Sequence, residues 1–161
     1  MLGRSALVVV AALSAATLGA TSGAAGTRAV PPEIRLVSTT TSQHVNDKPP
    51  KGQSAGDTIF ATSRLQNLVR QFGKARGATV GHDSGTTTLL DNGSVHMDGV
   101  ATLPGGTVHF RGTPQQVKGG TVIPVVGGTG RYDGVTGTLT ITDLDQIHAI
   151  NIYRLKQSLV A

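Results

Sequence analysis

Apolar and polar residues alternate over several short segments of this chain, and that period of two predicts β-strands. The segment from Val135 to Thr142 is the cleanest case, because one face carries Val, Gly, Leu and Ile while the other face is entirely Thr. The last segment, 146–155, differs because apolar side chains occupy both of its faces, with Ile150 and Ile152 on the second. We therefore expect a second layer or another subunit to cover the outside of that strand.

Turn residues separate eight such segments and predict an all-β domain. Residues 43–56 contain Asn, Asp, Pro and Gly in close succession and predict a loop. Residues 64–72 have apolar side chains at helix-like spacing, which leaves open a helical segment or an excursion between strands. No long helix is predicted, so the fold is a barrel or a sandwich. The predicted strands are 33–40, 57–63, 74–82, 95–103, 107–113, 121–126, 135–142 and 146–155, and a further short strand is considered over 86–90.

The clearest hairpin joins 95–103 to 107–113 through Pro104-Gly105-Gly106. If Leu103 pairs with Thr107, His96 and Asp98 lie on the same face as Phe110. A histidine and a carboxylate in a water-poor lumen could perform acid–base chemistry. The simpler interpretation, which we favour here, places both on the outer face or at the wet rim. Phe110 and Tyr153 are the expected large side chains of the lumen wall.

The segment from Val125 to Gly137 contains five glycines between two predicted strands. It lacks the spacing of a dinucleotide fingerprint, no Lys-Ser/Thr pair follows it, and a strand rather than a helix comes next. A phosphate-binding loop is therefore disfavoured. We expect a structural corner, built on Gly127, Gly128, Gly130 and Gly134.

The N-terminus has the composition of a signal peptide. Arg4 precedes an apolar, alanine-rich stretch from Ala6 to Ala20, which is too short for a confident membrane span. We expect a signal peptide over 1–26, a linker over 27–32 and one domain over 33–161. The chain has no cysteine, so neither a disulfide nor a thiol-linked lipid anchor is available. These features predict a secreted protein without a stable membrane anchor.

The formal net charge is +5, but the basic residues are scattered and few aromatic residues accompany them, so nucleic-acid binding is not expected. The five histidines show no H-x-H or HExxH pattern, so we expect no metal, and no motif calls for a cofactor. His82-Asp83-Ser84 contains the letters of a hydrolase triad. Adjacent residues of a strand point to opposite faces, so these three cannot be arranged as the nucleophile, base and orienting acid of a triad.

With these elements in place, the Gly127-Gly128-Thr129-Gly130 turn and its surroundings resemble the signature of the dirigent and allene oxide cyclase-like β-barrel proteins. Ser54-Ala55-Gly56-Asp57 resembles the family's entry into the second strand, and 103–112 resembles the hairpin of bacterial members. The likeness covers about residues 33–155. It implies an eight-stranded antiparallel, calycin-like barrel with an apolar lumen open at one end, often assembled as a trimer.

The chain departs from that family at its reactive positions. Allene oxide cyclase-like members place a carboxylate in the first strand and a cysteine in the third, where this sequence has Ser38 and Thr79. Two functions are therefore left open. The first is a barrel that binds a small hydrophobic molecule, with cyclase- or isomerase-like or dirigent-like steering activity. The second is a non-catalytic exported structural or interaction barrel with a filled core. A lumen of about 300 Å³ or more favours ligand binding.

Overall fold

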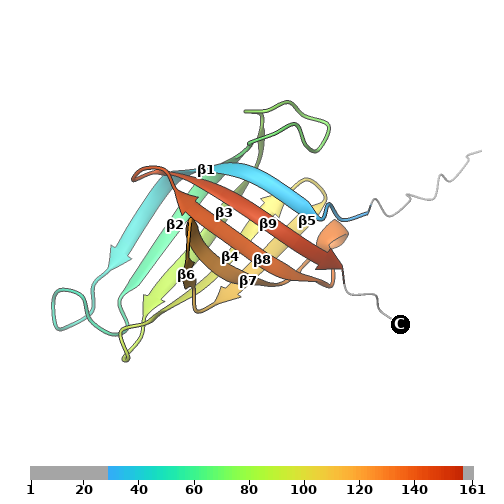
Figure 1. Ribbon diagram of the computed structural model, residues 1–161. Helices are drawn as coiled ribbons and strands as arrows, with labels where there is room; N and C mark the ends of the chain where they lie inside the picture. Colours follow the sequence, from blue (N-terminus) through green and yellow to red (C-terminus); the bar gives the residue numbers. More distant parts are fainter. Residues whose placement is uncertain (1–28, 158–161) are drawn as a thin grey trace, which may run out of the picture.

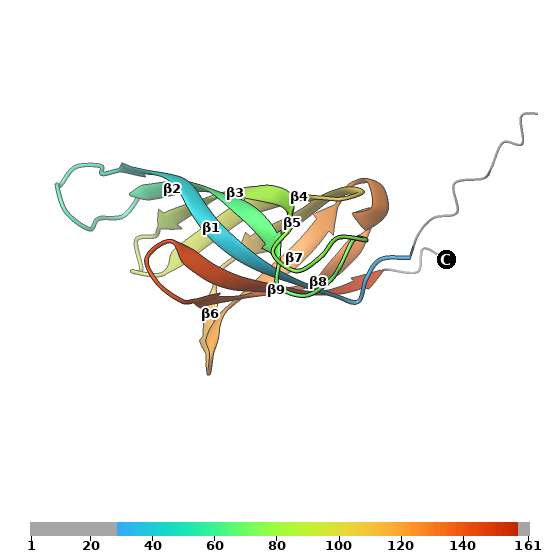
Figure 2. The same ribbon diagram turned by 90° about the horizontal axis from the view of Figure 1, so that it is seen from above.

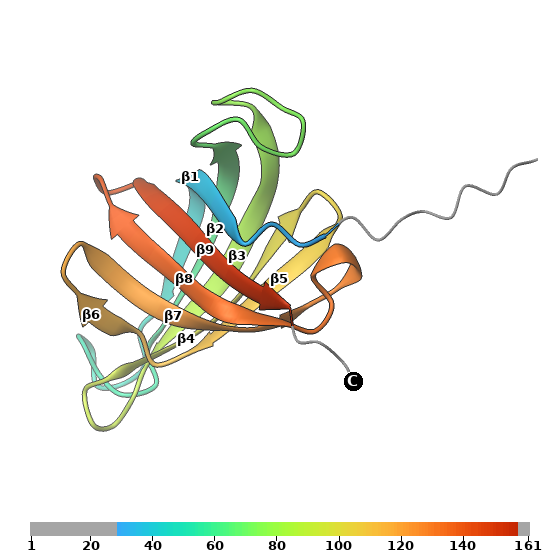
Figure 3. The same ribbon diagram turned by 45° about the vertical axis from the view of Figure 1, so that its right-hand side comes forward.

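The computed structural model describes residues 29–157, in which one antiparallel sheet curls into a closed barrel (Figures 1 and 2). The strand order is β5-β4-β3-β2-β1-β9-β8-β7-β6, and pairing between β5 and β7 closes the barrel with eight strands. The ninth strand, β6, pairs only with the start of β7 (Figure 3). The strands are β1 (Glu33–Asn46), β2 (Thr58–Asn67), β3 (Thr79–Leu89), β4 (Val95–Leu103), β5 (Gly106–Gly112), β6 (Gln115–Val117), β7 (Gly120–Gly128), β8 (Val135–Asp143) and β9 (His148–Gln157), with a 3-10 turn, η1 (Gly130–Tyr132).

The all-β prediction and the eight-stranded barrel are confirmed, but several boundaries differ. Strand β4 has the predicted limits, whereas β3 is one strand where the sequence suggested two pieces over 74–82 and 86–90. Between residues 29 and 157 there is no α-helix, so the spacing over 64–72 marks the end of β2 and a loop. The short strand β6 was not predicted. The expected signal peptide, 1–26, lies outside the described residues.

Strand β1 is longer than predicted and continues to Asn46, into the expected loop 43–56. Its register against β2 shifts between Thr40 and Ser42, and every residue from 41 to 46 is exposed. Such a bulge allows a strand to bend and continue past the barrel wall. The segment was missed because both of its faces meet water and no apolar alternation marks it.

One end of the barrel is closed by a dry core. The side chains share almost complete burial and come from all eight strands of the barrel and from η1, which follows β7. Because alternate residues of each strand point inward, a few positions per strand fill this end completely. The members that are fully buried are Ile34, Leu36, Leu65, Ala101, Val108, Ile123, Tyr132, Val135 and Tyr153.

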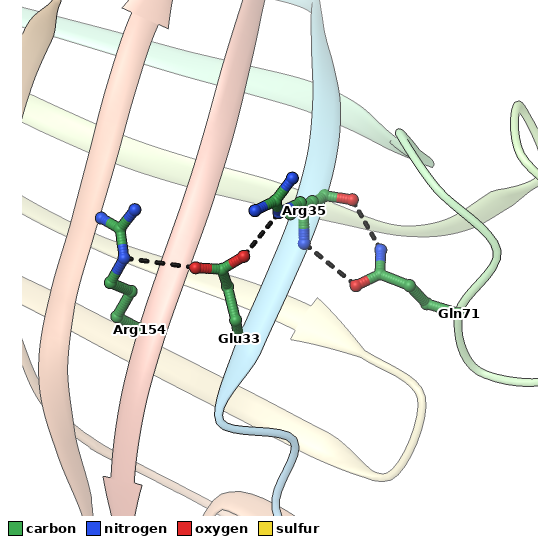
Figure 4. Close-up of polar contacts among 4 residues, drawn as sticks. All are labelled: Glu33, Arg35, Gln71 and Arg154. Atoms are coloured by element: carbon green, nitrogen blue, oxygen red, sulfur yellow. Dashed lines mark hydrogen bonds and ion pairs between the residues drawn. The ribbon is translucent and has the colours of Figure 1, made fainter.

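A loop over 68–78 covers this closed end and is fastened to β1 (Figure 4). The Gln71 amide accepts a hydrogen bond from the Arg35 backbone N–H (3.0 Å) and donates one to its carbonyl (2.6 Å). Buried Asn67 donates to the carbonyls of three loop residues, and Phe72 packs against the core. On the outer surface beside this contact, Glu33 pairs with Arg35 and with Arg154 of β9.

The glycine-rich segment forms the corner between β7 and β8. Gly127 and Gly128 end β7, Gly130 begins η1, and Gly134 precedes β8. Gly130 has φ +60°, and a Cβ there would lie 2.4 Å from the Gly105 carbonyl oxygen. Only glycine fits this close approach between the corner and the β4–β5 turn. Tyr132 of η1 then points inward and its hydroxyl donates to the Pro104 carbonyl (3.2 Å).

Candidate functional site

The other half of the barrel interior is hollow. A cavity of about 240 Å³ lies between the inner faces of β1, β2, β3, β4, β5, β8 and β9. A second cavity, of about 290 Å³, lies at the mouth beside the 47–57 loop, and the two share Ile59 and Thr87 in their walls. The inner cavity is smaller than a usual ligand pocket of about 300 Å³ or more, and the mouth cavity is close to that size. We call them the lumen and the mouth.

The lumen wall mixes apolar and polar side chains. Met97, Phe110, Leu139 and Ile141 supply its apolar surface. The polar members include Ser38 of β1, Ser63 of β2, Asp83 of β3, Asp143 of β8 and Asn151 of β9. Ser63 lies directly opposite Asp83 in the β2–β3 ladder, so the hydroxyl and the carboxyl share one face. The arrangement places a small polar group of residues at the floor of a hydrophobic cavity.

Asp83 is the central group of this floor. Burial raises the pKa of its carboxyl from 3.8 to about 6, and the neighbouring Ser63 hydroxyl and His82 charge oppose that rise only in part. The Asn151 amide nitrogen lies 3.4 Å from Asp83 Oδ2, a long contact. No ion pair among the described residues includes Asp83. A carboxyl with such a pKa can hold or release a proton near neutral pH.

Two buried polar atoms beside Asp83 have no partner in the described part of the chain: Asn151 Oδ1 and the Tyr153 hydroxyl. Tyr153 is fully buried, and burial and the nearby Asp83 charge raise its pKa well above 10.0, against the smaller opposing effect of the Asn151 amide. The phenol therefore stays protonated and can act as a donor. Native proteins satisfy nearly all buried polar groups, so the unpartnered Oδ1 of Asn151, a residue of the lumen wall, indicates a place for a ligand or water.

Phe110 forms a flat wall of the lumen. Its ring lies directly over Gly99 of β4, where a Cβ would be 2.3 Å from the ring's Cζ. Glycine at this position therefore allows the ring to lie flat against the sheet instead of crossing the lumen. Of the two lumen side chains named from the sequence, Phe110 lines the cavity, whereas Tyr153 is fully buried in the dry core of the closed end.

The predicted hairpin register is wrong by one residue. Leu103 pairs with Gly106, so the turn contains two residues rather than three, and Gly99 rather than Val100 lies opposite Phe110. A shift of one residue moves every side chain of a strand to the other face.

His96 and Asp98 therefore lie on the outer face, away from the lumen. Asp98 accepts a hydrogen bond from Arg111 Nε at 2.7 Å, and both side chains are about half exposed. This outcome agrees with the outer-face alternative that the sequence left open.

The lumen carboxylate Asp83 lies in the third strand, whereas the family resemblance leads one to expect a carboxylate in the first strand. The first-strand position is Ser38, which lines the lumen, and the third-strand position, Thr79, is exposed. Asp83 comes from β3 instead. Sequence reasoning missed it because glycines at 81 and 85 occupy the same inner face of that strand, so no apolar alternation distinguishes the face. Within residues 29–157, no group of three His, Asp or Glu side chains is placed to hold a metal.

No protein-family model and no curated protein matches the chain. Several solved structures, in contrast, have a similar fold. Pyocyanin demethylase aligns with a TM-score of 0.63 at 20% identity, over 77% of this chain and 99% of that chain. The Diels-Alderase AbmU from Streptomyces koyangensis gives 0.58 at 20% identity, over 78% of this chain and 64% of that one.

The pterocarpan synthase dirigent protein GePTS1 gives a TM-score of 0.55 at 13% identity, over 80% of this chain and 87% of that chain. At these identities the likeness is one of fold. The chain shares its barrel with dirigent and cyclase proteins.

Proposed function

We propose that this protein binds a small hydrophobic molecule in the lumen and steers its conversion by proton transfer, as an isomerase- or cyclase-like or dirigent-like barrel. One observation carries the proposal: a largely buried carboxyl, Asp83, lies in the wall of a partly apolar cavity beside Asn151, whose Oδ1 has no partner among the described residues. The proteins with similar folds include a demethylase, a Diels-Alderase and dirigent proteins, which is consistent with chemistry inside such a barrel.

The residues suggest a division of roles. Asp83 would exchange a proton with the bound molecule, because its raised pKa lies close to neutral pH. Asn151 Oδ1 would accept a hydrogen bond from that molecule, while the protonated Tyr153, buried behind the wall, would keep the surroundings of Asp83 free of a second charge. The apolar walls would hold the molecule in one shape, which lowers the entropic part of the barrier.

Binding of Nile red, a neutral hydrophobic dye, tests the proposal. We expect saturable binding that the replacement Phe110→Trp weakens, because a larger ring fills the lumen. The matched control is Phe60→Trp, since Phe60 is exposed on the outside of β2. Absence of saturable binding to the folded protein, or equal effects of the two replacements, would favour the barrel with a filled core.

We further propose that the protein acts after export, on the strength of the predicted signal peptide over 1–26. The intact mass of the protein recovered from the medium of its natural producer tests this proposal. We expect a mature form that begins near residue 27. Native mass spectrometry of the same sample measures the subunit number, for which the trimer implied by the family resemblance stays a prediction. It also detects any ligand that co-purifies.

A further inference from the structure

Charge is divided unevenly between the inside and the outside of this barrel. Among the described residues, the walls of the lumen and mouth contain four carboxylates and no Lys, Arg or His. The chain as a whole carries 14 Lys and Arg against 9 Asp and Glu. The interior is therefore acidic within a basic protein. The four carboxylates are Asp83 and Asp143 in the lumen and Asp47 and Asp57 at the mouth.

The two mouth carboxylates already have structural partners. Asp57 accepts hydrogen bonds from the backbone N–H groups of Lys48 (2.8 Å) and Ser54 (2.7 Å), and these bonds lower the pKa of Asp57. Asp47 accepts from the Gly52 N–H at 3.3 Å. Both shape the 47–57 loop. In contrast, the largely buried Asp83 has the long contact with Asn151 and a hydrogen bond from the Ser63 hydroxyl, but no ion pair among the described residues includes it.

A second observation indicates what Asp83 lacks. Asn151 lines the lumen, is 4% exposed, and its Oδ1 has no donor within residues 29–157. A carboxylate and an amide oxygen side by side both accept hydrogen bonds, so a group with several N–H donors satisfies them together. Hydrogen bonds to charged groups are shorter and stronger than neutral ones. The ring of Phe110, in the same wall, offers a further favourable surface for a cation.

Building on the proposed function, we propose that the lumen binds a hydrophobic amine in its protonated form, with the ammonium or iminium nitrogen seated between Asp83 and Asn151 Oδ1. The hydrocarbon body then packs against Met97, Leu139 and Ile141. An anionic molecule such as a carboxylic acid is disfavoured, because it would be buried next to Asp83 without a compensating cation.

The pH dependence has a definite sign. The ionisable groups facing Asp83 are Tyr153, which stays neutral, and Asp143 nearer the mouth, while His82 lies on the outer face of the same strand. Asp83 loses its proton as pH rises through about 6, while an alkylamine stays protonated. Amine affinity therefore rises from pH 5 to pH 7.5. The affinity of a neutral analogue stays nearly constant.

Three probes that share one skeleton test the inference: 1-naphthylmethylamine, 1-naphthalenemethanol and 1-naphthoic acid. The protein has no tryptophan, so naphthalene fluorescence reports binding directly. At pH 7.5 we expect the amine to bind about tenfold or more tighter than the alcohol, and the acid to bind weakest. Asp83→Asn should remove the advantage of the amine over the alcohol. Asp98→Asn, on the outer face, should keep it.

The outcomes separate this inference from the function on which it rests. Equal binding of all three probes, or strongest binding of the acid, would overturn the amine preference and leave a ligand-binding lumen. No binding of any probe to the folded protein would overturn both. If Asp83→Asn does not fold, the wild-type protein still decides, since an amine affinity that does not rise between pH 5 and pH 7.5 contradicts the proposed contact.

Discussion

The two halves of the barrel are built from the same strands and differ in what those strands place inside. Along β1, the inner face changes from Ile34 and Leu36 to Ser38 and Thr40, and along β9 it changes from Tyr153 to Asn151. The first half is filled and dry, and the second is hollow and partly polar. The closed half therefore supplies most of the packing energy, while the open half keeps a cavity and an ionisable group.

The boundary between the halves explains why Asp83 has unusual properties. Its carboxyl lies just beyond the dry core, where burial raises its pKa but a cavity remains on the other side. Tyr153 reaches the same boundary from the closed half with an unpartnered hydroxyl. The comparison predicts that substitutions in the closed half change stability, whereas those at the boundary change ionisation and binding.

The largest expected effect comes from the closed half. Leu36→Ala removes a completely buried side chain and should lower the free energy of unfolding by about 2–5 kcal/mol. Thr40→Ala, further along the same face of β1 and lining the lumen, should change it by less than about 1 kcal/mol. Urea unfolding at pH 7 measures both. Equal losses would mean that the two halves do not differ as described.

The next effect concerns Asp83 and pH. Its pKa in the folded protein, about 6, is above the ordinary 3.8, so its contribution to stability is present below pH 4 and is lost as pH rises through 6. Relative to Asp83→Asn, the wild-type protein should therefore lose up to about 3 kcal/mol between pH 4 and pH 7.5. Unfolding of both proteins across this range measures the difference.

A smaller effect is expected at the loop that covers the closed end. Gln71→Ala removes two hydrogen bonds to the backbone of Arg35 and should destabilise the loop locally by about 1 kcal/mol. Amide hydrogen exchange at Leu68 and Gly77 should become faster, with β8 unchanged. The matched change at the other end is Gln53→Ala in the mouth, which should leave these amides protected. Unchanged exchange in Gln71→Ala would show that the loop is held by packing alone.

The smallest effects should come from the outer face. His96→Ala and Asp98→Ala should each change the free energy of unfolding by less than about 1 kcal/mol, because the Asp98–Arg111 pair is solvent-exposed. Neither should change probe affinity beyond about twofold. Fluorescence titration checks this, and a large loss of binding would show that these residues belong to the binding site.

The sequence predicted the closed half better than the open half, for a physical reason. In the closed half the inner positions are apolar and alternate with outward-facing polar residues, as at Val135 and Thr136 of β8, and this alternation is readable. In the open half the inner face includes Ser38, Gly85 and Thr87, which resemble surface residues, so the alternation that would reveal the lumen is lost. In the sequence, Asp83 therefore stands out only as part of His82-Asp83-Ser84, which cannot form a catalytic triad.

The hairpin between β4 and β5 shows a second limit of sequence reasoning. Pro104-Gly105-Gly106 allows a two-residue or a three-residue turn, and the choice reverses both faces. In the structure Gly106, with φ +152°, joins the ladder opposite Leu103. Composition does not reveal that choice, because it depends on the contact between this turn and the corner around Gly130.

The most direct test of the account is an NMR titration of the Asp83 side-chain carboxyl carbon in the wild-type protein without ligand. We expect a midpoint near pH 6, because the carboxyl is largely buried and no ion pair among the described residues includes it. A midpoint near the ordinary 3.8 would mean that water or a cation already stabilises the charged form. That result would contradict the central claim that Asp83 is the reactive floor of a ligand-binding cavity.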